Sequence, residues 1–257
     1  MGLRTGFTGI LLALQFFTSL PIKFQLPITR MTATAMYGAI PLLGIGMGSI
    51  LAGIIVLNNS YLQFSSLFIA ILLVVAHFIM TGGLHMDGVV DTGDAFFSYR
   101  DKERRLEILD DPRVGAFGAM TLVIFVLLKV AVLYELLLHS IPIYYFIVLP
   151  FMARLSILLY FLTMKTFKNK GIAAYFKERV HARKLWLALI IYSLSLIAVS
   201  LFLQQLIWLV LFVVMLLFVA IYRYWTKKNF GGMSGDLVGA CFEGTELLLW
   251  FTLLLFI

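Results

Sequence analysis

The sequence predicts an all-α fold: a polytopic integral membrane helical bundle with about seven transmembrane helices and a short N-terminal apolar segment. Of its 257 residues, 62% are hydrophobic and 13% are charged. The mean hydropathy is +1.01, which is more apolar surface than a water-soluble domain can bury. The apolar residues form runs of about 20, the length that crosses a hydrocarbon core of ~30 Å. Lysine and arginine collect between these runs.

Seven apolar runs are predicted to span, at residues 33–57, 61–80, 116–138, 141–163, 185–204, 205–222 and 236–257. The break at Gln204 and Gln205 is faint, so six crossings are the alternative. Residues 7–20 are apolar but short and end at Pro21. This first segment therefore spans, re-enters or lies in the interface. A cleavable signal peptide is not expected, because no small-residue cleavage pattern follows.

The net charge of +7 is unevenly distributed along the chain. Lysine and arginine concentrate in segments 20–32, 82–115, 164–184 and 223–235, whereas the connections near 58–60, 139–141 and 204–205 contain none. Because basic loops stay in the cytoplasm during insertion, all the long loops are predicted to be cytoplasmic. We expect a multi-pass protein of the cytoplasmic (inner) membrane, with any active site facing the cytoplasm. The excess of positive charge is expected to set the orientation of the chain in the membrane and to attract the anionic lipid headgroups of the bilayer. No nucleic-acid partner is expected.

The chain is predicted to form one membrane-embedded domain over residues 1–257. No Gly/Ser/Pro-rich linker, low-complexity tract or clear long-period repeat divides it, and short antiparallel connections favour up-and-down packing. The single cysteine, Cys241, excludes an intramolecular disulfide.

Segment 82–115 holds eight of the thirteen acidic residues. If residues 84–95 are helical, then Asp87, Asp91 and Asp94 stand at i, i+4 and i+7 and form a single stripe. Like charges at this spacing repel by a few tenths of a kcal/mol per pair, so we expect a cation among them. That cation is an Arg or Lys cluster or a divalent metal, and oxygen ligands without cysteine suit Mg²⁺ or Mn²⁺.

Two neighbours of this stripe are candidates for substrate contact. Gly88 carries no side chain, so a large ligand can approach the backbone there. His85 lies two residues before Asp87 and is a candidate to contact a ligand or a phosphate.

A second acidic array lies in "NFGGMSGDLVGACFEGTELLLW", where Asp236, Glu243 and Glu246 share one helical face. The turn that contains Ser234 and Gly235 opens a helix whose free N–H groups and dipole favour phosphate. Glu243 lies about 10 Å beyond Asp236 along the helix, and an ionisable group at such depth usually faces a polar cavity. Both arrays begin at the same membrane boundary, so we expect them to converge on one site.

Four further ionisable side chains lie within predicted spans. Arg154 is expected either to clamp a diphosphate with its planar guanidinium or to pair with a helix neighbour. Lys129 and Glu135 are expected to form a structural pair or to extend toward the interface. His77 is expected in the bundle interior, hydrogen-bonded to a neighbouring helix.

The run "GGLHMDGVVDTGDAFFSYRDKERRLEILDDPRVGAFG" resembles the signature of the cobalamin synthase family, the membrane-bound adenosylcobinamide-GDP ribazoletransferases. "GGMSGDLVGACFE" resembles that family's second signature, and "LQFFTSLPI" and "AIPLLGIGMGSI" support the match, which covers most of the chain. Ser234 departs from the expected Thr but keeps the hydroxyl, and "DDPR" has Pro where the family more often has Ser before Arg113. Residues 185–222 match only as apolar helix.

The resemblance implies a Mg²⁺-dependent phosphotransferase, with Mn²⁺ possible as the cofactor. It would join adenosylcobinamide-GDP to α-ribazole, or to α-ribazole 5′-phosphate, giving adenosylcobalamin or its 5′-phosphate and GMP. The expected partners are these two small-molecule substrates and the lipid bilayer, with a homo-oligomer or an association with other cobalamin-assembly enzymes as further options.

On this interpretation the residues divide into three groups. The predicted metal ligands are Asp87, Asp91, Asp94, Asp236 and Glu243. The predicted substrate contacts are His85, Gly88, Arg113, Arg154, Ser234, Gly235 and Asp236. The predicted catalytic residues are Asp94, Asp91 and Asp87, with Asp94 as a candidate acceptor for the hydroxyl proton.

Two other functions fit parts of the sequence. A membrane phosphotransferase of the CDP-alcohol type also carries Asp-Gly on a helix end, but its motif continues with Ala-Arg, where this chain has Val89 and Val90 before Asp91. A cation transporter would use Glu243 and Glu246, yet it leaves the polar segment 82–115 unexplained.

Overall fold

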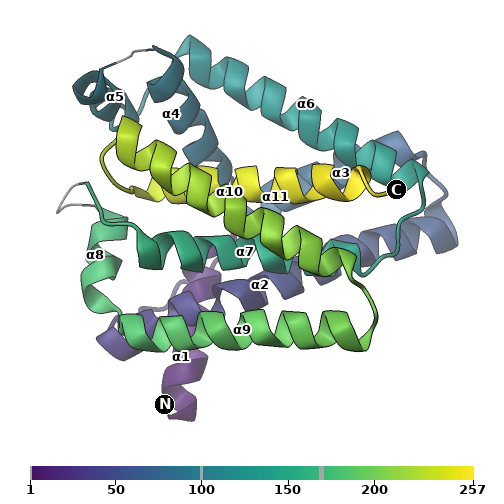
Figure 1. Ribbon diagram of the computed structural model, residues 1–257, viewed down its shortest axis with the longest axis horizontal. Coiled ribbons are helices and arrows are strands. Elements are labelled where there is room, and N and C mark those ends of the chain that lie inside the picture. The colour runs from purple at the N-terminus through teal and green to yellow at the C-terminus, as the bar shows by residue number, and fades with distance from the viewer. Residues whose placement is uncertain (1, 99–100, 168–170) are drawn as a thin grey trace.

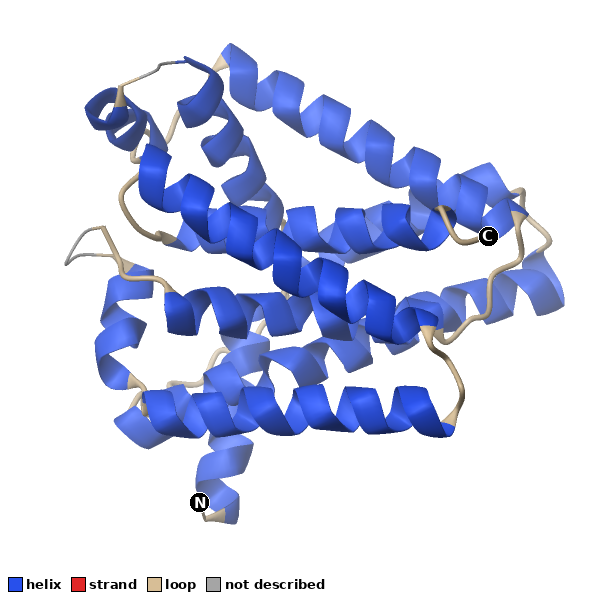
Figure 2. Ribbon diagram, in the orientation of Figure 1, coloured by secondary structure: helices blue, strands red, loops and turns tan. Residues whose placement is uncertain are grey.

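The computed structural model describes residues 2–98, 101–167 and 171–257, and within these ranges every regular element is a helix (Figures 1 and 2). The elements are α1 (Leu3–Phe17), α2 (Arg30–Leu57), the short π-helix η1 (Asn58–Leu62), α3 (Ser66–Thr81), α4 (Leu84–Ser98), α5 (Lys102–Leu109), α6 (Ala116–Leu138), α7 (Tyr145–Thr163), α8 (Ile172–Arg179), α9 (Ala182–Phe202), α10 (Ile207–Asn229) and α11 (Gly235–Leu254). Thr166 and Met233 add one isolated parallel bridge.

Six of the described helices are long and apolar enough to cross a membrane, namely α2, α6, α7, α9, α10 and α11, and the bent pair α3–α4 makes a seventh if it counts as one span. The predicted polytopic bundle is therefore confirmed. The faint break at Gln204 is real, because its backbone takes the left-handed conformation, with φ of 56°, between α9 and α10. The first segment, α1, is an apolar helix of 15 residues, shorter than a span.

The bundle is built around α2 and α7, which pack closely because two glycines of α2 face the α7 backbone. A Cβ atom at Gly44 would lie 2.8 Å from the Cα of Phe151, and one at Gly48 would lie 2.8 Å from the Cα of Ile147. Within the most apolar 18-residue stretch of α7, 72% is buried inside the protein, against 22% for the same stretch in each of α6, α9 and α10. Helix α7 is thus the centre of the bundle, and the outer helices present their apolar side chains to lipid.

The connection between α3 and α4 turns the chain by 97°. Gly82 and Gly83 make this turn with φ of +63° and +75°, a left-handed conformation that glycine adopts at no steric cost. Helix α4 therefore runs across the direction of the long helices, at the end where α5 and α8 also lie (Figure 1). The predicted span 61–80 ends at this bend, and the first acidic stripe lies beyond the bend, on α4.

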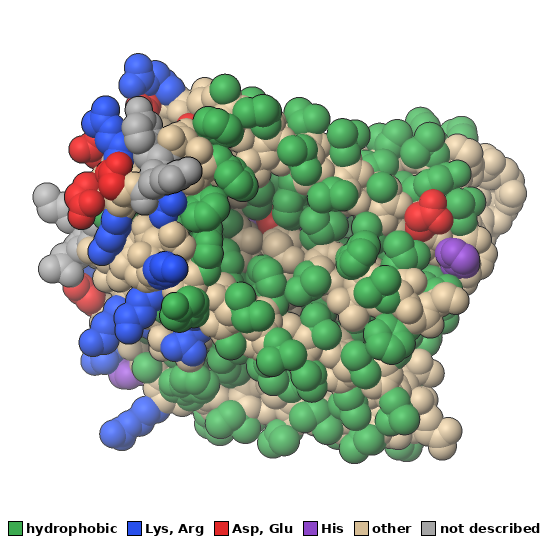
Figure 3. Space-filling model, turned by 45° about the horizontal axis from the view of Figure 1, so that its top comes forward, with side chains coloured by type: hydrophobic (Ala, Val, Ile, Leu, Met, Phe, Trp, Pro, Cys, Tyr) green, Lys and Arg blue, Asp and Glu red, His purple; other side chains and the backbone are tan. Residues whose placement is uncertain are grey.

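Charge separates from apolar surface along the long axis of the bundle. Figure 3 shows most of the visible Lys, Arg, Asp and Glu side chains at one end and hydrophobic side chains over the rest of that face. The polar segments 101–115 and 223–235 lie at this charged end, as the alternation of basic connections predicted.

Candidate active site

Two glycines, one on each helix, bring α4 and α11 into backbone contact. A Cβ atom at Gly88 would overlap the backbone of Asp236, whose Cα would lie only 2.9 Å away. A Cβ atom at Gly239 would lie 2.9 Å from the carbonyl oxygen of His85. Because a real Cβ almost never comes within 3.0 Å of such atoms, only glycine fits at either position. This contact places the middle of α4 beside the start of α11.

Of the second acidic array, Asp236 meets the first array at this contact, whereas Glu243 and Glu246 lie deeper, with Lys129, and do not join it. Asp87, Asp91 and Asp94 all lie on α4, and the stripe runs from the exposed Asp87 through the half-buried Asp91 to the buried Asp94. Burial, followed by the negative charges of Asp87, Asp236 and Asp94, raises the pKa of Asp91 from 3.8 to about 7. These four aspartates are called the carboxylate cluster below.

Asp94 also caps a neighbouring helix, a contact that the sequence analysis missed. Its Oδ2 accepts a hydrogen bond from the N–H of Gly115 at 3.1 Å, and its Oδ1 accepts one from the N–H of Gly118 at 3.0 Å. Both donors belong to the start of α6, where the first N–H groups have no partner within the helix. A Cβ at Gly118 would lie 3.1 Å from the Cβ of Asp94. The two glycines in "VGAFG" are therefore the feature of the sequence that could have indicated a close contact at the start of α6. Asp94 thus fixes α6 to α4.

The start of α11 is built by Ser234, which precedes the helix. Its Oγ accepts a hydrogen bond from the N–H of Leu237 at 3.2 Å and donates to Oδ2 of Asp236 at 3.2 Å. The preceding Met233 donates its N–H to the carbonyl of Lys165 at 2.9 Å. A cavity of about 190 Å³ adjoins this turn. Its lining includes Asp110, Thr166, Met233, Ser234, Gly235 and Asp236.

Two predicted substrate contacts, His85 and Arg154, have their recorded partners in the bundle interior. His85 is 4% exposed and lies between the rings of Phe17 and Phe242, at centroid distances of 6.3 Å and 4.6 Å. Arg154 is 2% exposed. Its guanidinium lies 4.8 Å from the centroid of Phe242 and 2.6 Å from Sδ of Met47. These contacts give both side chains a packing role.

Arg113 is at the surface of the charged end, between α5 and α6. Its Nε and NH2 groups bind the two carboxylate oxygens of Asp111 at 2.9 Å and 2.7 Å. The guanidinium is therefore oriented by a neighbouring acid outside the carboxylate cluster.

A separate group of charged side chains lies deep in the bundle and links three helices. Lys129 of α6 places its Nζ 2.7 Å from Oε2 of Glu243 and 2.6 Å from Oε2 of Glu246, both on α11. His77 of α3 places its Nε2 3.4 Å from Oε1 of Glu243. All four side chains are at most 6% exposed. They are called the buried ion network below.

The buried ion network corrects the partner expected for Lys129 and bears on the position expected for His77. Lys129 pairs with α11 rather than with Glu135, which is exposed on α6. The interior position expected for His77 is confirmed, but its Nε2 lies near Glu243 without forming the expected hydrogen bond. The ligand atoms of His77, Glu243 and Glu246 lie within 4.8 Å of one another and could hold a metal ion. The ammonium of Lys129 already supplies a positive charge between the two glutamates.

The chain was compared with known proteins. The family model described as cobalamin-5-phosphate synthase matches residues 9–254. A relative from Geobacillus thermodenitrificans (strain NG80-2) is 35% identical over 250 residues, covering 96% of this chain and 95% of the relative. One from Halalkalibacterium halodurans is 36% identical, with the same coverage, and one from Clostridium botulinum (strain 657 / Type Ba4) is 34% identical over 98% of this chain and 100% of the relative. All three are named adenosylcobinamide-GDP ribazoletransferase. No solved structure matched.

Replacing Lys129 by Met should destabilise the protein, because Glu243 and Glu246 would keep their charges in the interior without the ammonium between them. Breaking a buried ion pair on one side costs about 3–5 kcal/mol. Unfolding of the purified protein by sodium dodecyl sulfate, followed by circular dichroism, measures the change. The control Glu135→Gln removes an exposed charge on the same helix and should stay within about 0.5 kcal/mol of the unmodified protein. Equal stability of the two variants would contradict the role given to Lys129.

Proposed function

The chain belongs to the cobalamin-5-phosphate synthase family, and from this membership we propose that it carries out the adenosylcobinamide-GDP ribazoletransferase reaction at the carboxylate cluster. It is a membrane transferase of cobalamin biosynthesis. In the proposed reaction, α-ribazole or its 5′-phosphate is joined to the corrinoid of adenosylcobinamide-GDP, and GMP is released. The observation that carries the assignment of the site is the convergence of Asp87, Asp91 and Asp236 at the α4–α11 contact.

The carboxylates of the cluster are ligand types that suit a divalent cation, although within the part of the chain that the structure describes only His77, Glu243 and Glu246 gather three ligand atoms within 4.8 Å of one another. Among the described residues, no Lys or Arg forms an ion pair with Asp87 or Asp91, and burial, followed by the neighbouring negative charges, raises the pKa of Asp91. A divalent ion relieves that repulsion. Carboxylate oxygens are the ligands that Mg²⁺ and Mn²⁺ prefer, and Mg²⁺ usually combines one or two of them with substrate phosphates.

Asp87, Asp91 and Asp236 would hold this ion. Asp94 already accepts two N–H bonds from α6, so its first role is to position that helix, and its part as a ligand or proton acceptor stays a prediction. Glu243 lies in the buried ion network with Lys129, which supports leaving it out of the ligand set. The same pairing weakens the cation-transporter alternative, since Lys129 lies where a carried ion would bind.

The chemistry is a phosphoryl transfer between two bound substrates. A ribose hydroxyl of α-ribazole forms a bond to the phosphorus that carries the corrinoid arm, while the bond from that phosphorus to the GMP oxygen breaks. When bound, Mg²⁺ supplies positive charge to the diphosphate oxygens. The N–H groups at the start of α11 favour a phosphate beside Asp236. A carboxylate of the cluster accepts the hydroxyl proton, and no covalent enzyme intermediate is required because positioning and electrostatics provide most of the catalysis.

We further propose that the carboxylate cluster faces the cytoplasm. The cluster lies on α4 and at the start of α11, at the end of the bundle where α5 and α8 also lie (Figure 1), and basic connections stay on the cytoplasmic side during insertion. The two substrates would then reach α4 and α11 from the cytosol without crossing the bilayer.

Replacing Asp91 by Asn should abolish turnover while the fold is retained. The amide keeps the shape but removes the charge at the centre of the cluster, and the loss of one such charge typically costs at least about 100-fold in rate. GMP release is measured with purified protein, Mg²⁺, adenosylcobinamide-GDP and α-ribazole. Glu103→Gln, an exposed acid on α5, is the matched control and should remain active. Near-normal turnover of Asp91→Asn would refute the site. Absence of GMP from the unmodified protein, with Mg²⁺-dependent ion flux in liposomes, would refute the function.

Binding of Mn²⁺ in the absence of substrate should strengthen as the pH rises. The raised pKa of Asp91, about 7, means that a proton occupies the carboxylate below neutrality and must leave before the metal binds. The fraction of deprotonated Asp91 increases about tenfold between pH 6 and pH 8, so the affinity should increase about tenfold. Electron paramagnetic resonance of free Mn²⁺ at the two pH values measures it. An affinity that does not change with pH would show that Asp91 is not a ligand.

A further inference from the structure

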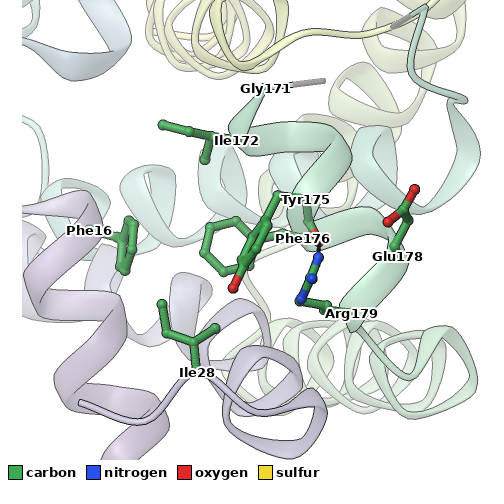
Figure 4. Close-up of a pocket in the computed structure, with 8 residues that line it drawn as sticks. All are labelled: Phe16, Ile28, Gly171, Ile172, Tyr175, Phe176, Glu178 and Arg179. Atoms are coloured by element: carbon green, nitrogen blue, oxygen red, sulfur yellow. Dashed lines mark hydrogen bonds between the residues drawn. The ribbon is translucent and has the colours of Figure 1, made fainter. Parts of the chain in front are cut away.

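A second, larger cavity of about 540 Å³ lies between α1 and α8 at the charged end of the bundle (Figure 4). Figure 4 shows Phe16 of α1 facing the rings of Tyr175 and Phe176 on α8, with Ile28 below them and Arg179 at the side. The proposed reaction and the carboxylate cluster do not account for this cavity. It is called the aromatic cavity below.

The walls of the aromatic cavity are rings held in fixed contacts. The ring of Phe176 is 2% exposed and meets Phe16 edge to face at 5.4 Å and Tyr175 at 5.2 Å between centroids. The guanidinium of Arg179 lies 3.8 Å from the centroid of Tyr175. Tyr175 itself is 40% exposed, so part of its side chain is accessible to a ligand. Small-molecule sites have this character: a concave volume of roughly 300–1,000 Å³, mostly apolar and aromatic, with a few polar groups.

The aromatic cavity adjoins the smaller cavity beside the carboxylate cluster. Gly171 and Ile172, at the start of α8, line both, and Asp236 lines the smaller one. Gly171 has a φ of +98°, which lets the chain enter α8 without a side chain between the two cavities. The bridge between Thr166 and Met233 joins the segment before α8 to the turn before α11. The two cavities are therefore neighbours, separated at Gly171 and Ile172.

We propose that the aromatic cavity binds the base of the attacking nucleoside, with its ribose extending past Gly171 toward Asp236. This inference rests on the proposed function. Of the two substrates, only α-ribazole presents a fused aromatic base with little polar character, which suits three aromatic rings. Guanine would need several hydrogen-bond partners, because unpaired polar groups lose affinity on burial, and Glu178 and Arg179 are the only charged side chains among the described lining residues.

The steady-state test separates the two substrates. Tyr175→Ala and Phe16→Ala should each raise the KM for α-ribazole about five- to tenfold, the size expected for one lost aromatic contact. The KM for adenosylcobinamide-GDP should stay within about twofold, because the lost contact belongs to the other substrate. Phe202→Ala, which truncates an 85% exposed ring at the far end of α9, is the control and should change neither constant.

Two outcomes would overturn the proposal. One is an unchanged KM for α-ribazole in both cavity variants. The other is an equal rise of both KM values, which indicates a general loss of structure. If added anionic phospholipid restores the activity of the cavity variants while the KM for α-ribazole is unchanged, the cavity holds a lipid and the proposal is wrong.

A binding measurement keeps this test independent of turnover and of the folding of the alanine variants. Tyr175→Trp introduces a fluorophore into the cavity wall with little change in shape. Titration with α-ribazole alone should quench its additional fluorescence saturably, whereas Phe202→Trp should show no saturable change. Quenching in a protein that releases no GMP would support binding of α-ribazole in the aromatic cavity and refute the proposed reaction. Normal GMP release without quenching would support the proposed reaction and refute binding of α-ribazole in the aromatic cavity.

Discussion

The backbone contact between α4 and α11 is the constraint on which the site depends. Gly88 and Gly239 are the two positions where a Cβ would collide with the opposite helix, and their contact brings acids that are more than 140 positions apart in the sequence next to one another. The 97° bend at Gly82 and Gly83 is the second requirement, since a straight α3–α4 helix would carry the acidic stripe away from α11. Glycine therefore supplies the geometry of the site, and in the proposed reaction the carboxylates would supply its chemistry.

The protein handles negative charge in two different ways at two depths. In the bundle interior Glu243 and Glu246 face Lys129 at 2.7 Å and 2.6 Å, so the charges balance within the protein, as burial away from water requires. At the charged end, Asp91 is only half-buried and its strongest electrostatic neighbours are other acids. The first arrangement leaves little room for a ligand, whereas the second gains stability from a cation. This contrast is why we assign structure to the deeper group and chemistry to the shallower one.

The sequence predicts what depends on local periodicity and on composition. The spans, the single stripe of Asp87, Asp91 and Asp94, and the charged end follow from spacing, length and the distribution of lysine and arginine. The partners of Lys129 and Asp94 do not. Lys129 binds Glu243, 114 positions away, and Asp94 caps α6 across a connection of 17 residues, 99–115. Both contacts depend on how the helices pack, and that packing follows from the bend at Gly82 and from glycine contacts that no periodic pattern reveals. The aromatic cavity was missed for the same reason, since Phe16 and Phe176 meet only in the folded chain.

The isolated bridge between Thr166 and Met233 connects the turn before α11, which carries Asp236, to the segment before α8, which lines the aromatic cavity. A Cβ at Gly232 would lie 3.0 Å from the Cα of Phe167, so the glycine-rich turn before α11 is pressed against the segment that leads into α8. Ser234 then starts α11 and binds Asp236. The turn thus carries Asp236, one acid of the carboxylate cluster. It also lines the smaller cavity that adjoins the aromatic cavity. A substitution at Gly232 would shift both together, so in the proposed reaction the glycine-rich turn before α11 would position the nucleoside and the metal ligand Asp236 at once.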